Sequence, residues 1–221
     1  MSLNFHTKIL KSFKTVTAMM RDRGNVPKTT LNETSTVEEW REKFQNPLNN
    51  PKITYNCNLV YVQPDGTKGC VYWPKDPKIG VESVKYFTSL SEKNSMNAFI
   101  LVVTESITTQ SRKDIEENIK YVYNAEYFYL EKLLINITKH KFVPKHIRLS
   151  EEERDKIVEQ YNTKIENFPQ ILDTDPIARY YNFKPGELIK IERYFDHYSG
   201  KLDYTKKPDI SYCLVVKPDL G

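Results

Sequence analysis

The chain has 221 residues, a formal net charge of +4 and no run of the roughly 18 apolar residues that a membrane-spanning helix needs. Apolar residues make up 39% and charged residues of both signs 28%, which excludes the composition of a disordered chain. The small positive charge permits contact with a polyanion, but it is weaker than that of a dedicated DNA-binding domain. Either one large domain or two small domains fit this length.

The cysteines and the first residues indicate an intracellular protein. Cys57, Cys70 and Cys213 form no C-x-x-C pair and are odd in number, which argues against a disulfide framework and predicts reduced thiols. The opening "MSLNFHTKILKSFK" is amphipathic and lacks the apolar core of a secretory signal. We therefore expect neither secretion nor a membrane location.

Hydrophobic periodicity in the first half predicts helices alternating with strands. Gly24 ends the first helix after a basic turn, Ser35 and Glu38 form a capping box for the second, and a turn at 64–66 predicts a hairpin. The continuous apolar run at 97–106 predicts a buried central strand in an α/β layer with some parallel pairing. The predicted helices cover 5–20, 35–44, 81–90 and 108–120, and the predicted strands cover 53–62, 69–73 and 97–106.

The hydrophobic periodicity and the residue composition change in the middle of the chain. Residues 126–138 are rich in aromatic and branched side chains and fit either one long strand or a helix that enters a strand. Pro144 then interrupts the periodicity of 140–150, a segment that also carries basic and imidazole side chains. We expect the domain junction here, with an N-terminal domain over 1–141 and a C-terminal domain over 142–221.

A helix and a final strand frame the C-terminal domain. Ser150 and Glu153 form a capping box at the start of the helix, and Pro169 is expected to end it. The last β-prone run covers 210–218. The residues expected on the buried face of the helix are Ile157, Val158, Tyr161 and Ile165.

Local rules specify the stretch "DPIARYYNFKPGELIKIER" almost completely. Asp175 is a good N-cap, Pro176 a good first helical residue, and Asn182 can adopt the left-handed conformation that ends a helix. A turn at 184–186 then leads into a strand over 187–193 that alternates apolar and charged residues. This agreement of local signals predicts a rigid, foldable segment and no chemistry.

The same stretch, with the preceding "INITKHKFVPKHIRLS", resembles the assembly domain of the fifth subunit of eukaryotic DNA-dependent RNA polymerases. Archaeal polymerases have a counterpart that lacks the jaw domain of the eukaryotic form. The pieces "MMRDRG", "WPKDPKIGVESVKYF" and "AFILVVTESIT" resemble that jaw domain, so the resemblance extends over nearly the whole chain. The chain departs from the family pattern at Asn182, at Cys213 and in a longer loop over 194–209. The matching assembly-domain residues are Pro169, Ile171, Asp175, Pro176, Ala178, Arg179, Tyr180, Lys184, Gly186, Lys190, Ile191 and Arg193.

The resemblance implies an α+β or α/β protein. Its N-terminal α/β jaw domain would have a nuclease-like mixed sheet with flanking helices, and its C-terminal assembly domain would be a small α+β unit. It implies a non-catalytic subunit that docks on the largest polymerase subunit and lies in the lower jaw near downstream duplex DNA. Further implied partners are the other polymerase subunits and transcription regulators. The implied location is the nucleus or, for a virus-encoded copy, the virion or the infected-cell cytoplasm.

The resemblance also assigns candidate contact residues, with no catalytic residue, metal or cofactor among them. A polar helix start would contact DNA phosphates without reading sequence, although an ordinary polar helix cap explains the same residues. The candidates for DNA contact are Thr108, Thr109, Gln110, Ser111, Arg112 and Lys113, and those for the assembly interface are His146, Asp175, Pro176, Arg179, Tyr180, Lys184, Gly186, Lys190 and Arg193.

Two other functions remain open from the sequence. Asp65, Asp76 and Lys78 imitate the P-D…D-x-K pattern of Mg²⁺-dependent nucleases, in which carboxylates hold the metal and lysine supports the attacking water. However, Asp65 falls in a Pro-Asp-Gly turn, which is a structural explanation for it. The second alternative is a free-standing transcription adaptor of the same fold.

Overall fold

The computed structural model describes residues 5–28, 36–39, 58–74, 76–196, 201–202 and 204–218. The chain divides into two compact units, Met1–Ile135 and Asn136–Gly221. The junction expected between residues 141 and 142 falls inside the second unit. None of the described helices is both long and apolar enough to cross a membrane.

A five-stranded mixed sheet forms the centre of the first unit, in the order β1-β2-β3-β5-β7. β3, β5 and β7 are parallel, whereas β1 and β2 extend the sheet in antiparallel fashion. All six residues of β5 are buried, so the predicted central strand is confirmed. The strands are β1 (Val26–Pro27), β2 (Asn58–Val62), β3 (Lys68–Tyr72), β5 (Ala98–Val103) and β7 (Glu126–Tyr129).

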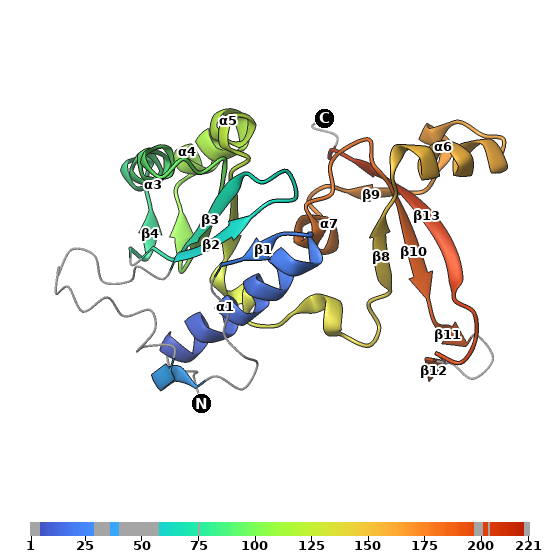
Figure 1. Cartoon of the computed structure of the whole chain (residues 1–221), viewed down its shortest axis with the longest axis horizontal. Coiled ribbons are helices and arrows are strands. Elements are labelled where there is room, and N and C mark those ends of the chain that lie inside the picture. Colours follow the sequence, from blue (N-terminus) through green and yellow to red (C-terminus); the bar gives the residue numbers. More distant parts are fainter. Residues whose placement is uncertain are drawn as a thin grey trace. The chain divides into compact units, whose positions relative to one another are not determined.

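Helices lie on both faces of this sheet (Figure 1). On one face, Phe13 of the first helix stacks on Trp73 with ring centroids 5.4 Å apart, and the Trp73 indole donates to Ser12 Oγ at 2.9 Å. On the other face, Val84 and Ile115 pack against the sheet side chains. The elements are α1 (Phe5–Asp22), β4 (Lys78–Ile79), α3 (Val81–Lys93), β6 (Ser106–Ile107), α4 (Thr109–Lys113), the π-helical η1 (Asp114–Ile119) and α5 (Lys120–Tyr123).

The prediction for residues 126–138, which extend from the first unit into the second, needs correction. The segment 126–138 is neither one long strand nor a helix entering a strand, because β7 is followed by the 3-10 helices η2 (Leu130–Leu133) and η3 (Ile137–Lys139). The helix predicted from Ser35 lies mostly outside the described residues. Within 36–39, Thr36 and Glu39 make the reciprocal capping bonds.

A four-stranded sheet in the order β8-β10-β13-β9 organises the second unit. β10 and β13 are its inner strands, and they pair antiparallel along six residues each. β9 is parallel to β13, whereas β8 is antiparallel to β10. The strands are β8 (Lys145–Arg148), β9 (Gln170–Leu172), β10 (Leu188–Arg193) and β13 (Asp209–Val216), with a small separate pair of β11 (Phe195–Asp196) and β12 (Lys201–Leu202).

Both faces of this sheet are covered, by different helices. Ala178 of α7 (Pro176–Tyr181) packs on Ile189 and Ile191, whereas α6 (Glu151–Gln160) packs with Leu188 on the opposite face. The mixed α and β class with mixed sheets is therefore confirmed. The sequence predicted the burial of the isoleucine face of β10, but it did not predict that the other face is also buried at Leu188.

The sequence prediction for the second unit is partly right. The capping box of Ser150 and Glu153 is present, but α6 ends at Gln160 and a 3-10 turn, η4 (Ile165–Asn167), separates it from Pro169. Pro169 therefore does not end the helix. The supposed junction 140–150 contains β8, a strand that the sequence analysis did not predict.

Candidate functional site

The DNA-contact candidates lie at the start of α4. Thr108 is its N-cap: the hydroxyl Oγ1 accepts from the Ser111 backbone N–H at 3.2 Å and lies 2.7 Å from Ser111 Oγ. Ser111 is fully buried, so its hydroxyl serves the helix start and is not presented to a ligand. Thr109, Gln110, Arg112 and Lys113 are exposed.

Acidic residues follow these exposed groups along the same helical segment. Gln110 donates to Asp114 Oδ1 at 3.1 Å, and Glu116 and Glu117 are exposed on η1. Arg112 and Lys113 are therefore the only basic side chains between Thr108 and Ile119, and three carboxylates accompany them. Such a surface can make a few phosphate contacts, but its charge does not favour tight binding of DNA.

The nuclease-like set is not brought together. The Asp65 carboxylate accepts from the backbone N–H and hydroxyl of Thr67 at 2.9 and 2.7 Å, and these bonds, the hydroxyl first, lower its pKa. Asp65 precedes β3, whereas Asp76 and Lys78 follow it. Lys68, just after Asp65, is bonded to Asn97 before β5, whereas Pro77, next to Asp76, is bonded to Glu105 and Ser106 after β5. The six residues of β5 span about 20 Å at about 3.3 Å each, which is too far for the two carboxylates to share one metal ion. No group of three potential metal ligands occurs within the described ranges.

The assembly candidates on α7 mostly hold the second unit together. Asp175 caps the helix by accepting from the Ile177 N–H at 2.8 Å, and Pro176 occupies the first turn with its ring exposed. Tyr180 is only 4% exposed, and its hydroxyl accepts from Asn136 Nδ2 at 3.1 Å. Arg179 is half-buried. Of these four candidates, Pro176 presents most of its side chain outward.

The turn after α7 is equally well bonded. Asn182 takes the left-handed conformation at φ 55°, and its side-chain oxygen accepts from Lys184 Nζ at 2.7 Å. The Lys184 backbone N–H donates to Glu187, and Gly186, at φ 91°, donates to the Val215 carbonyl at 2.9 Å. Lys184 and Gly186 thus fix the path of the chain into β10.

On β10, Lys190 and Arg193 point to opposite faces of the sheet. Lys190 Nζ lies 2.8 Å from Glu192, whose carboxylate is also 3.7 Å from Lys145 Nζ. Arg193 is exposed and donates to Ser211 Oγ at 2.5 Å, one step across the sheet. The alternation that the sequence predicted therefore places an ion pair of Lys190 and Glu192 on one face of the sheet and the cation of Arg193 on the other.

His146 lies opposite Ile191 in the sheet, on the face that α7 covers. Its Nδ1 is 2.8 Å from the Pro144 carbonyl oxygen. Burial lowers the pKa of His146 below its ordinary value, and the Pro144 carbonyl and the Asp175 carboxylate partly offset this shift. His146 is therefore mostly neutral at pH 7, and its position is that of a packed structural residue.

Arg148 was not among the functional residues predicted from the sequence. From β8, its guanidinium donates to Glu187 at 3.1 Å and to the Asn182 carbonyl at 2.8 Å, and it lies 5.3 Å from the centre of the Phe183 ring. It thus satisfies a carbonyl at the end of α7 and ties β8 to that helix. Arg148 is the last residue of "KHIR", two residues after His146. The sequence could have indicated its role only if these four residues had been predicted to form the strand β8.

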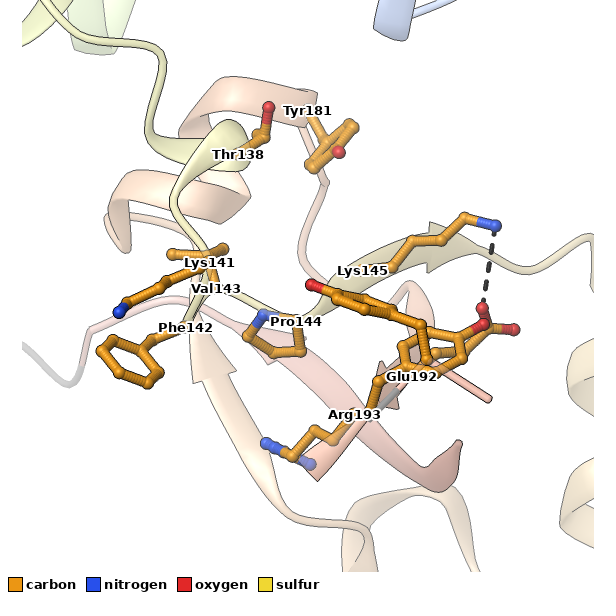
Figure 2. A pocket seen from close by; sticks show the side chains of 11 residues that line it. Thr138, Lys141, Phe142, Val143, Pro144, Lys145, Tyr181, Glu192 and Arg193 are labelled. Carbon is orange, nitrogen blue, oxygen red and sulfur yellow. Dashed lines mark ion pairs between the residues drawn. The ribbon is translucent and has the colours of Figure 1, made fainter. Parts of the chain in front are cut away.

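A pocket of about 520 Å³ opens beside the start of β8 (Figure 2). Tyr194 and Tyr204 pack against each other with ring centroids 5.2 Å apart, and Lys141 Nζ lies 4.8 Å from the centre of the Phe142 ring. Of the assembly candidates, only Arg193 lines it. The lining residues are Thr138, Lys141, Phe142, Val143, Pro144, Lys145, Tyr181, Glu192, Arg193, Tyr194 and Tyr204.

Comparison with known proteins adds a consistent set of relatives. The family described as "RNA polymerase Rpb5, C-terminal domain" matches residues 135–204. A Dictyostelium discoideum protein, subunit rpabc1 of DNA-directed RNA polymerases I, II, and III, is 32% identical over 190 residues, which cover 84% of this chain and 90% of that protein.

Two further relatives have similar coverage. An Arabidopsis thaliana DNA-directed RNA polymerase subunit 5-like protein is 32% identical over 85% of this chain and 89% of its own length. The corresponding subunit of polymerases I, II, and III from Caenorhabditis briggsae is 28% identical over 81% and 86%. Among solved structures, a DNA-bound ATP-dependent Type ISP restriction-modification enzyme is 14% identical, with a TM-score of 0.35 over 76% of this chain and 10% of that one, a likeness too low to support a conclusion.

Proposed function

This chain belongs to the family of the fifth subunit shared by DNA-directed RNA polymerases I, II and III, and we propose that it joins such an enzyme by docking its second unit on the largest subunit. It is a non-catalytic subunit of a multi-subunit polymerase, and its partners are other polymerase subunits. The observation that carries the docking proposal is the family match over residues 135–204, which falls almost entirely within the second unit.

The second unit has the properties of a rigid docking piece. Its sheet is covered on both faces, and the family residues Asp175, Tyr180 and Lys184 are bonded within the unit. Rigid elements bind a partner with a smaller loss of conformational freedom than flexible ones do. In this proposal, those residues act by shaping the surface, and exposed groups such as Pro176 and Arg193 make the contacts.

The first unit, in this proposal, forms part of the lower jaw near downstream duplex DNA, within the nucleus. The support comes from exposed Thr109, Gln110, Arg112 and Lys113 at the start of α4. The acidic residues beside them are consistent with weak, non-specific contacts to phosphates that become useful only when the polymerase holds the DNA in place. Transcription regulators are further proposed partners.

Affinity purification of the tagged chain from cells of its source organism, with mass spectrometry of the recovered proteins, tests the proposal. We expect the two largest polymerase subunits in stoichiometric amounts and a nuclear location of the tagged chain by microscopy. Recovery of the chain without those subunits would show that it acts outside the polymerase, as a free-standing adaptor would.

A further inference from the structure

The pocket beside β8 carries more positive than negative charge. Lys141, Lys145 and Arg193 line it, against one carboxylate, Glu192. That carboxylate is 2.8 Å from Lys190 Nζ, which lies outside the lining, and 3.7 Å from Lys145 Nζ, so its charge is already offset. Both Lys141 and Lys145 are exposed. The pocket is therefore suited to an acidic ligand.

Its walls also offer apolar contact area. Phe142 is 62% exposed and Tyr204 is 68% exposed, which are large values for aromatic side chains in a folded unit. Aromatic side chains with this exposure are enriched where proteins bind other proteins, because they supply contact area at a low cost in rotamer freedom. The ligand should thus present apolar side chains as well as negative charge.

The neighbouring strand offers hydrogen-bonding groups. β8 is at the edge of its sheet and pairs only with β10 within the part of the chain that the structure describes. The Leu149 N–H donates to Leu188, so by the alternation of antiparallel ladders Ile147 and Lys145 face β10, whereas the backbone groups of His146 and Arg148 face outward. An edge of this kind can accept one further strand.

Together these features define one continuous site, because Pro144 and Lys145 line the pocket and also begin β8. We propose that the pocket and the outer edge of β8 bind one extended, acidic polypeptide segment from another subunit of the polymerase. This inference rests on the proposed function and deepens it by naming the chemistry of the partner segment. The backbone of the segment would pair with the edge of β8, and its acidic side chains would lie beside the cations of the pocket.

Single-stranded nucleic acid is the main competing ligand, because cations interleaved with aromatic rings also bind stacked bases. One observation favours the polypeptide. The outward backbone N–H and C=O groups of β8 have complementary acceptors and donors in a peptide backbone, whereas a phosphate chain offers only acceptors. The nucleic acid is therefore an outcome that the test must be able to show.

The test uses the full chain and a fluorescently labelled, end-capped heptapeptide of alternating Glu and Val, with the Lys/Val peptide and an oligothymidylate as alternative ligands. We expect fluorescence anisotropy to show binding of the acidic peptide only, weakening as salt rises. Lys141→Glu should weaken that binding about tenfold, because it reverses a charge of the site. Lys217→Glu is the matched control. It reverses a charge at an exposed position just after β13, and it should change the affinity for the acidic peptide by less than about twofold.

Amide hydrogen exchange gives a second readout that is specific for strand addition. Saturating peptide should slow exchange at the His146 and Arg148 amides, which face outward, and leave the inward Ile147 amide unchanged. Unslowed exchange at both amides would overturn the strand pairing. Absent peptide binding, equal binding by Lys141→Glu, or preference for oligothymidylate would overturn the acidic-segment assignment.

The premise and the inference can fail separately. If the wild-type chain co-purifies with the two largest polymerase subunits but fails the peptide test, only the assignment of the pocket is wrong. If the wild-type chain does not co-purify with them, the proposed function fails, and the peptide result then reports only on the chemistry of the pocket.

Discussion

The start of α4 and the stretch from Asp175 to Arg193 were both selected by the same resemblance, yet the structure uses their polar residues differently. At α4, Thr108 and Ser111 cap a short helix and leave two cations exposed beside several carboxylates. In the later stretch, most polar groups are bonded within the unit, and Arg193 reaches a pocket with other cations and aromatic rings. A polar residue shared with a family can therefore serve folding, binding or both, and only its bonding partners distinguish them.

The largest expected effect tests whether the later stretch is primarily structural. Ile189→Ala should lower the free energy of unfolding of the second unit by about 3 kcal/mol, because Ile189 is fully buried and the deletion leaves a cavity. Ile210→Ala is a matched control on the neighbouring strand; its side chain is 49% exposed, and the loss should stay below about 1 kcal/mol. Urea denaturation followed by amide NMR signals measures both. Equal losses would contradict the packing described for β10.

A smaller effect tests the start of α4. Replacing Arg112 and Lys113 together by glutamine should weaken duplex DNA binding by the full chain a few-fold at low salt and lower the salt slope by about 2, because each phosphate contact releases about one counterion. Replacing Glu116 and Glu117 by glutamine is the control and should not weaken binding. Anisotropy titrations over a salt series measure both. An unchanged slope in the Arg112 and Lys113 variant would remove these residues from the DNA-contact proposal.

The smallest effect concerns the pH dependence of the stability of the second unit, which contains His146. Because burial lowers the folded pKa of His146, the unfolded chain binds more protons between the two pKa values, and stability falls as pH drops below about 6.5. The second unit should therefore lose stability between about pH 7 and about pH 5, and His146→Gln should reduce that loss. Urea midpoints of both proteins at the two pH values measure it. An identical pH dependence in the variant would show that His146 is not responsible.

The sequence predicted the elements whose local signals agree with their packing. The helix from Pro176, with its Asp175 cap and left-handed Asn182, is present as predicted, and so is the buried strand β5. Both result from short-range steric and hydrophobic rules. The mixed sheets also followed from the alternation of helices and strands in the first half of the chain.

Other features depend on contacts between distant residues, and the sequence did not reveal them. β8 is only four residues long and half-buried, and its strand identity depends on pairing with β10, more than 40 residues later. The pocket likewise combines the segment before β8 with Tyr194 and Tyr204. Tertiary pairing therefore decided these features, and no local pattern specifies them.

The position of β13 has a consequence for how the chain is made. β13 is an inner strand of its sheet, paired on both sides, and it comes after the other three strands in chain order. During synthesis, β9 and β10 cannot form their sheet pairs with β13 until β13 has been made. The sheet of the first unit, in contrast, can form completely once β7 has emerged from the ribosome. A ribosome that stalls before Asp209 would thus release a folded first unit joined to an incomplete second one, and any docking that depends on the second unit would exclude such products from the polymerase.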